Sequence, residues 1–313
     1  GGGRGPIRKI LSFTDRRDAP RGEASMTDFL QLVISGLATG AIYALAAIGF
    51  TLLWQTTQTI NFAQGEFMML PAFFALAAMR WMGAPFWMAC VFAILASILV
   101  LGVAYKKVII EPLRGQPGLA VVISTLALAI FLKDGVKDLY SAEAQPFPTI
   151  LPDVPIRFAG VTISLAQVGV LIVATVTILL LNWFLTQTRT GRQMQATAQN
   201  PTVAKILGVN IERMVLYTFL INAALAGMAS LLISPIYLAK FSNGEVLGLA
   251  AFVAAIVGGF NQVRGAIAGG LVIGVVDNLA AFYVSTAYRQ AVPLVLLVLV
   301  ILFRPQGLLG RKE

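Results

Sequence analysis

Residues 29–65 read FLQLVISGLATGAIYALAAIGFTLLWQTTQTINFAQG, a stretch of 37 positions without a charged side chain. A helix that crosses the hydrocarbon core of a bilayer needs about 20 mostly apolar residues, whereas apolar runs of about 10–14 residues are typical of buried helices in soluble proteins. The stretch is too long for a soluble core helix. It therefore predicts at least one membrane-spanning segment.

Eight further apolar runs follow, and Asp277 places the only charge inside them. These runs comprise residues 67–79, 81–105, 115–132, 158–188, 214–239, 246–263, 265–288 and 290–303. The sequence therefore predicts an all-α fold, a polytopic membrane helical bundle of about eight (8–9) transmembrane segments. Some of these segments are expected to be broken or re-entrant.

The composition supports a membrane protein and excludes most catalytic chemistry. Of 313 residues, 58% belong to the AVILMFWYC set and 12% are charged, against about 45–50% and about 25% in soluble domains. The absence of histidine and the single cysteine, Cys90, exclude histidine-based triads, histidine-ligated metals and a disulfide framework. There is also no G-x-x-x-x-G-K-[ST] phosphate loop. We expect no catalytic residue, no metal site and no bound cofactor in this chain, so that any ATP is used by partner subunits.

The first 25 residues differ from the rest. They are rich in Gly and Arg and carry six basic and three acidic side chains. We expect residues 1–25 to be a disordered tail or a start-site artefact ahead of Met26, and residues 26–313 to form one transmembrane domain. The formal net charge is +9. Outside the tail its strongest clusters fall in loops, which indicates membrane orientation and no nucleic-acid partner.

Basic loops predict the orientation, because lysine and arginine concentrate on the cytoplasmic side. Residues 133–157 mix three basic with four acidic side chains and contain four prolines, which is typical of an extracytoplasmic lid. Nine spans would place the N-terminus outside, whereas the basic tail favours the inside. One segment, within 55–79 or 246–288, is therefore expected to be re-entrant or half-length. Three regions are expected in the cytoplasm, the last with the C-terminus: residues 106–114, 185–214 and 304–312.

The first suspected break carries polar side chains between two apolar runs. Residues 55–66 read QTTQTINFAQGE. Each unpaired polar group in hydrocarbon costs several kcal/mol, and irregular backbone is tolerated there only when it is buried in protein or lines a cavity. A substrate pathway and a polar interfacial turn explain this stretch equally well. The candidate pathway residues are Asn61, Gln64, Gly65 and Glu66.

Asp277 is a further candidate pathway residue. An ionisable side chain at membrane depth is functional or is paired inside the bundle. Arg264 and Asn278 are candidate partners for its carboxylate. The small number of such charges disfavours a proton-coupled transporter, which needs a relay of carboxylates or histidines.

Residues 190–213 predict two short helices outside the membrane. Residues 191–199 can form the first, Asn200 with Pro201 is a favourable N-cap and N1 pair for the second, and Gly208 suits its end. One face of the second helix is apolar and comprises Val203, Ile206 and Leu207. Such a loop docks on another protein or, alternatively, packs on its own membrane helices. The candidate docking residues are Gly191, Arg192, Ala196, Asn200, Pro201, Ala204, Leu207 and Gly208.

Glycines at spacings of four indicate close helix packing. The adjacent pair at 258–259 adds an expected flexible point. The candidate packing residues are Gly36, Gly40, Gly258, Gly259, Gly265, Gly269, Gly270 and Gly274.

Four motifs together resemble those of a known family. They are SGLATGAIYALAAIGFTLL at 35–53 followed by INFAQGE at 60–66, AQNPxxAxxLGV within 191–213, the Gly-rich segment 254–274, and FRPQGLLG at 303–310. They are similar to the first-helix signature, coupling loop, Gly-rich motif and C-terminal motif of LivH-type permease subunits of ABC importers for branched-chain amino acids. The resemblance covers nearly all of residues 26–313. Two departures leave the ligand open: NQVR at 261–264, where a smaller turn is usual, and Asp277 in place of a common Glu.

The resemblance implies an ABC importer permease domain that translocates leucine, isoleucine and valine across a bacterial inner membrane. It implies as partners a second, LivM-type permease subunit, two cytoplasmic ATPase subunits, and a periplasmic binding protein that docks near residues 141–157. Similar permeases carry urea, short amides or other amino acids, so these remain alternative substrates.

Two other classes of protein remain alternatives to an importer subunit. A stand-alone secondary transporter or channel would not need the docking loop. An intramembrane protease would need a pair such as Asp134 and Asp138, but these alternate with Lys133 and Lys137 and fit a solvated helix end better.

Overall fold

The computed structural model describes residues 26–113, 115–149, 154–158, 161–285, 288 and 291–310. The expected tail at 1–25 lies outside the described residues. In chain order the elements are α1 (Met26–Thr57), α2 (Gln64–Met82), α3 (Phe86–Ser97), the π-helical stretches η1 (Ile98–Ala104) and η2 (Lys106–Ile110), α4 (Gly118–Leu139), β1 (Pro155–Phe158), β2 (Val161–Ser164), α5 (Leu165–Gln187), α6 (Arg189–Gln199), α7 (Pro201–Ile206), α8 (Ile211–Tyr237), α9 (Asn243–Gly258), α10 (Val263–Tyr283) and α11 (Ala291–Phe303).

The predicted helical membrane bundle is confirmed. By length and composition six described helices can cross a membrane, namely α1, α3 with its continuation to Ile110, α4, α5, α8 and α10. The shorter apolar helices α9 and α11 have 16 and 13 residues. α2 has 19 residues and contains Pro71. The sequence predicts one half-length segment. In the structure three described apolar helices, α2, α9 and α11, are shorter than the six that can cross a membrane.

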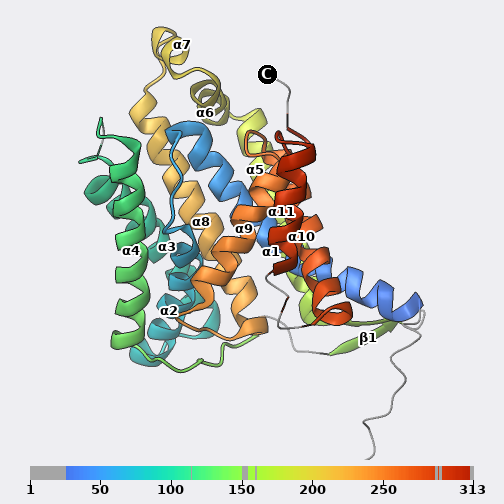
Figure 1. Ribbon diagram of the computed structural model, residues 1–313. Coiled ribbons are helices and arrows are strands. Elements are labelled where there is room, and N and C mark those ends of the chain that lie inside the picture. The colour runs from blue at the N-terminus through green and yellow to red at the C-terminus, as the bar shows by residue number, and fades with distance from the viewer. Residues whose placement is uncertain are drawn as a thin grey trace, which may run out of the picture.

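The two ends of the bundle differ (Figure 1). Helices α6 and α7 project at one end, named the α6–α7 end, where the last described residues also lie. The antiparallel hairpin of β1 and β2 lies at the other, named the hairpin end. α1 starts at the hairpin end, because Gln167 beside β2 donates to Ser35 at 3.1 Å. The first and the last described residues thus lie at opposite ends of the bundle.

The predicted break after α1 is present. Gln58 has a positive φ of 52°, and the next residues turn back into the bundle before α2 starts (Figure 1). Gln64, the first residue of α2, contacts Asn222, which is 11 residues into α8. At 1.5 Å per residue, α2 therefore begins about 16 Å inside the Ile211 end of α8.

Small residues let α1 and α10 pack with their backbones in contact. A Cβ atom on Gly40 would lie 2.9 Å from the carbonyl oxygen of Gly270, and a Cβ atom on Gly270 would lie 2.5 Å from the Cα of Ala44. Gly36 and Gly274 lie at the same crossing, where a Cβ atom on either would meet backbone of the other helix. The crossing excludes side chains, as small-residue motifs in membrane helices do.

The corner between α9 and α10, where the sequence predicts a flexible point, is closely packed. Gly258 abuts Gly265 across the corner, and Gly259 has a φ of 113°. The N–H of Leu308 donates to the carbonyl of Val257 at 2.8 Å. The segment after α11 therefore closes this corner. Gly269 packs on the same end of α9.

The short hairpin departs from the all-helical prediction. Ile156 lies opposite Ile163 in the pairing of β1 with β2, and Ser164 then caps α5 through the N–H of Ala166 at 3.2 Å. Strands of four residues are too short for a period-two pattern to be recognised in the sequence.

Candidate functional site

Gln64 and Asn222 form a closed pair of amides inside the bundle. Gln64 Nε2 donates to Asn222 Oδ1 at 2.7 Å, and Asn222 Nδ2 donates back to Gln64 Oε1 at 2.9 Å. Both side chains are fully buried. The pair joins the start of α2 to the middle of α8, and each amide satisfies the other, as polar groups at membrane depth require.

The irregular backbone ahead of α2 is held by neighbouring side chains. Asn61 Oδ1 accepts from the N–H of Ala63 at 3.0 Å, and the N–H of Phe62 donates to Thr125 Oγ1 of α4 at 3.3 Å. The segment is therefore satisfied within the protein, which is the condition for non-helical backbone at this depth.

Gly65 and Glu66 pack against the first turns of α9. A Cβ atom on Gly65 would lie 3.2 Å from the Cα of Gly248, and the Glu66 carboxylate lies against Gly244. Glu66 is 3% exposed, and its Oε2 has no hydrogen-bond partner among the described residues. The glycine face of α9 is thus the surface on which the start of α2 rests.

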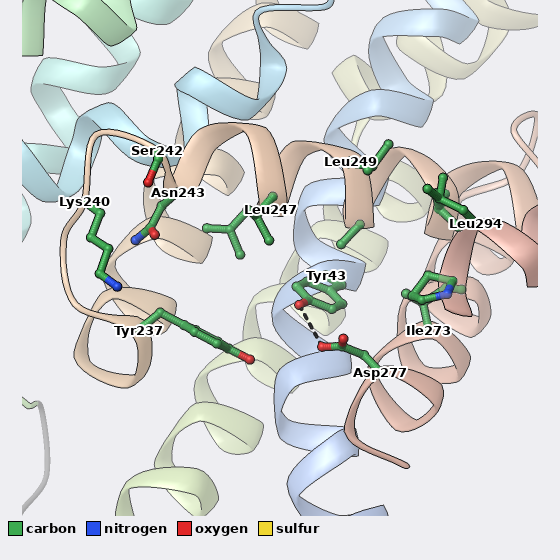
Figure 2. Close-up of a pocket in the computed structure, with 14 residues that line it drawn as sticks. Tyr43, Tyr237, Lys240, Ser242, Asn243, Leu247, Leu249, Ile273, Asp277 and Leu294 are labelled. Atoms are coloured by element: carbon green, nitrogen blue, oxygen red, sulfur yellow. Dashed lines mark hydrogen bonds between the residues drawn. The ribbon is translucent and has the colours of Figure 1, made fainter. Parts of the chain in front are cut away.

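A cavity of about 410 Å³ lies along the other face of α9 (Figure 2). Successive helix residues are 100° apart, so Val246, Leu249 and Val253, which line the cavity, point away from the face of Gly244 and Gly248. α1, α10, α11 and the loop after α8 complete the walls. The residues that line the cavity are Tyr43, Tyr237, Lys240, Ser242, Asn243, Val246, Leu247, Leu249, Ala250, Val253, Ile273, Asp277, Pro293 and Leu294.

Asp277 lies in the wall of this cavity, and its partner there is a tyrosine. Tyr43 of α1 donates its hydroxyl to Asp277 Oδ2 at 3.2 Å (Figure 2). Of the two partners expected from the sequence, Arg264 is 13 residues earlier in α10, about 20 Å along the axis. Asn278 donates instead to the carbonyl of Gly274 at 3.0 Å. Neither expected partner pairs with Asp277, because Arg264 lies too far along the helix and the Asn278 amide bonds within its own helix.

The predicted pathway residues thus fall into two places. Asn61, Gln64, Gly65 and Glu66 gather at the start of α2. Asp277 belongs to the cavity, with α9 between the two groups.

Helices α6 and α7 form where the capping residues predict. The side chain of Thr188 accepts from the N–H of Gly191 at 3.0 Å at the start of α6, and Asn200 Oδ1 accepts from the N–H of Val203 at 3.0 Å at the start of α7. Gly208 has a φ of 82°, as a helix-ending residue requires. Local capping chemistry therefore determines both helices.

The two short helices leave an apolar face uncovered. Ile206 and Leu207 are 78% and 75% exposed, and Val203 is also exposed. Arg192, Asn200, Pro201 and Gly208 lie on the surface too. Gly191 and Ala204 are buried, and Gly191 abuts the backbone of Phe184. These two residues shape the helices from inside and do not form the surface, which corrects their predicted place.

Three residues of the site were missed in the sequence. Tyr43 lies inside the first-helix motif at 35–53 and Asn222 inside an apolar run, and no spacing marks either residue or Lys240 as part of a site. A polar side chain inside an apolar run is a signal for burial against a partner, but only the fold identifies that partner. Within the described residues, no group of three or more Cys, Asp or Glu is placed to hold a metal ion.

Comparison with known proteins shows to which family the chain belongs. The family described as branched-chain amino acid transport system, permease component, matches residues 32–301. The high-affinity branched-chain amino acid transport system permease protein BraD of Pseudomonas aeruginosa is 36% identical over 91% of this chain and 97% of that protein. The permease protein LivH of Escherichia coli K12 is 33% identical over 91% and 96%. A probable branched-chain amino acid transport permease of Methanocaldococcus jannaschii is 27% identical over 86% and 89%.

These relatives are permease components, which is consistent with a transport subunit that has no catalytic activity. A permease component works with the other parts of its transport system. The apolar helices and the relatives together make the chain a multi-pass membrane protein. With a family match over most of its length and two relatives above 30% identity, the chain belongs to the permease-component family of branched-chain amino acid transport systems.

Proposed function

We propose that this chain is the membrane-spanning permease subunit of an ATP-driven ABC importer for leucine, isoleucine and valine. Its partners in the proposal are a second, LivM-type permease subunit, two cytoplasmic ATPase subunits and a periplasmic binding protein that delivers the substrate. The names of the related permeases support this substrate class. Urea, short amides and other amino acids are the competing substrates.

The observation that carries the proposal is the apolar face of α7. α7 is too short to fold alone and projects from the bundle (Figure 1). Its last residue, Ile206, and its C-cap, Leu207, are exposed. Exposed apolar side chains of this kind mark a protein interface. Docking of the ATPases there would link their closure to α8, which follows α7 after a four-residue connection at 207–210. A ligand shifts a conformational equilibrium only when it binds the two states with different affinity, and ATP would do so through this contact.

The distribution of charge supports a cytoplasmic location of the α6–α7 end and the C-terminus in the inner membrane. Basic residues concentrate on the cytoplasmic side of membrane proteins. In chain order, Lys106 and Lys107 begin η2 in the last turns of the span that starts with α3, Arg192 and Lys205 lie in α6 and α7, and Arg304 follows α11.

The experiment replaces Leu207 with Asp and measures uptake of labelled leucine in a strain that lacks its own permease. Burying an unpaired carboxylate in an apolar interface is strongly unfavourable, so uptake should fall more than about tenfold and the ATPases should no longer co-purify. Leu207→Met is the matched control, since it keeps an apolar side chain of similar size and should retain uptake.

Two results would contradict the proposal. Wild-type uptake by Leu207→Asp at an equal amount in the membrane would remove the ATPase contact from α7. Uptake of urea or short amides by the unaltered chain, without uptake of leucine, isoleucine or valine, would remove the substrate class.

A further inference from the structure

The cavity beside α9 combines both signs of charge with an aliphatic wall. Lys240 supplies a cation, Asp277 an anion, and Leu247, Val253 and Ile273 an apolar surface. A free aliphatic amino acid carries an ammonium and a carboxylate next to an apolar side chain. Taking both charges out of water is costly unless each finds a partner.

We infer that this cavity binds a zwitterionic aliphatic amino acid within this subunit, with its ammonium group at Asp277 and its carboxylate at Lys240. The inference deepens the proposed function and rests on it, because it adds a substrate site that belongs to the permease itself.

The anionic end is buried and held by a hydrogen bond. Asp277 is 5% exposed and Tyr43 is 3% exposed, and the hydrogen bond between them at 3.2 Å orients the carboxylate. An ionised carboxylate offers about four acceptor positions. Asp277 can therefore accept from an ammonium group while it keeps the bond from Tyr43.

The cationic end lies at the mouth of the cavity. Lys240 is exposed in the loop between α8 and α9, and its ammonium group carries three donors. Ser242 and Asn243 place further polar groups beside it, and the hydroxyl end of Tyr237 points in the direction of Asp277 (Figure 2). Polar groups thus run along one side of the cavity from its mouth to Asp277.

The rest of the cavity suits a branched aliphatic side chain. Leu247, Val253 and Ile273 are fully or almost fully buried, and Leu249 and Leu294 line the more open part (Figure 2). Pockets for small molecules usually measure about 300–1,000 Å³ and are mostly apolar with a few placed polar groups. The volume of about 410 Å³ lies in this range.

The test is protection of a cysteine placed in the wall. Leu249→Cys is made in a Cys90→Ser background, and its reaction with a small thiol reagent is followed in membranes that hold the assembled transporter without the binding protein. Leucine at several times its dissociation constant should slow the reaction at least about fivefold. 3-Methylbutylamine, which lacks the carboxylate, and 4-methylpentanoate, which lacks the ammonium group, should protect at least about tenfold more weakly.

Variants assign the two charges. Protection by leucine should be lost in Asp277→Asn and in Lys240→Gln, and Asp277→Glu should restore part of it. Lys137→Gln is the matched control, because Lys137 is an exposed lysine at the end of α4 that does not line the cavity. The amount of each variant in the membrane, compared with that of Asp277→Glu, separates loss of binding from loss of folding.

Three outcomes would overturn the inference: no protection by leucine, equal protection by either analogue, or protection that survives both charge-removing variants. Uptake by the unaltered chain in cells is measured in parallel. If that chain imports no branched-chain amino acid, the proposed function fails. If it does import one, and Asp277→Asn and Lys240→Gln import it equally well, only the site in the cavity fails.

Discussion

Helices α1 and α4 are equally apolar and lie in different surroundings. The most apolar 18-residue window has a mean hydropathy of 1.9 in α1 and 2.0 in α4, yet 72% of that window is buried in α1 and 17% in α4. α8 resembles α1, with 67% buried, whereas α5 resembles α4, with 22%. Hydropathy therefore identifies membrane helices without separating those in the core of this chain from those on its outer surface.

The difference lies in side-chain size and polarity. In α1, glycine and alanine dominate the buried stretch around Gly40, whereas α4 exposes large residues such as Ile130 and Phe131. Without a hydrophobic force between helices in lipid, close packing and interhelical hydrogen bonds hold them together. The polar pairs of the site, which involve Gln64, Asn222 and Asp277, accordingly lie among the core helices.

The strongest test of this contrast is a pair of glycine-to-alanine changes. Gly270→Ala places a Cβ atom 2.5 Å from the backbone of Ala44, which cannot rotate away. We expect a loss of about 3 kcal/mol in the free energy of unfolding. Gly135→Ala in α4 meets no atom within 4 Å and should leave stability unchanged or slightly raised, because alanine favours helix. Chemical unfolding in detergent measures both, and equal effects would contradict the division into core and peripheral helices.

A double-mutant cycle on Gln64 and Asn222 should give the next largest effect. Either alanine variant alone leaves a buried amide without its partner, at a cost of about 1–3 kcal/mol. The double variant should be less destabilised than the sum, with a coupling of about 1 kcal/mol. Additive losses in the same unfolding assay would show that the two amides do not support each other.

The ion pair that joins the peripheral helix α4 to the core helix α9 should have the smallest effect on stability. Lys133 of α4 pairs with Glu245 of α9, and the glutamate side chain is 63% exposed. Exposed ion pairs contribute about 0–1 kcal/mol, so Glu245→Gln should lower the free energy of unfolding by less than about 1 kcal/mol. The matched control is Glu143→Gln, a change at an exposed glutamate in the loop after α4. A loss for Glu245→Gln several times larger than for this control would mean that α4 is held by charge instead of by packing.

Features that depend on a few neighbouring residues could be predicted from the sequence. The apolar runs predict the membrane helices, and Asn200, Pro201 and Gly208 predict α7 because caps act within one turn. The break near residue 58 follows from the polar run after α1. These predictions needed no knowledge of which helices touch.

Features that depend on distant contacts could not be predicted. The partner of Asp277 is Tyr43, 234 positions away, and the partner of Gln64 is 158 positions away. The inward place of Ala204 depends likewise on how α7 sits against the rest of the chain. Sequence spacing indicates that such groups need partners and leaves the choice of partner to the fold.

The packed corner at Gly258 has a consequence for the order in which the protein is completed. The carbonyl of Val257 is made about 50 residues before Leu308, whose N–H it accepts. During synthesis, α9 and α10 are therefore complete before the residue that closes this end of α9 has been added. The hydrogen bond that closes the corner can form only after residue 308 has been synthesised. A reporter protein fused directly after α11 in place of the following segment would leave the newly inserted bundle open at this corner.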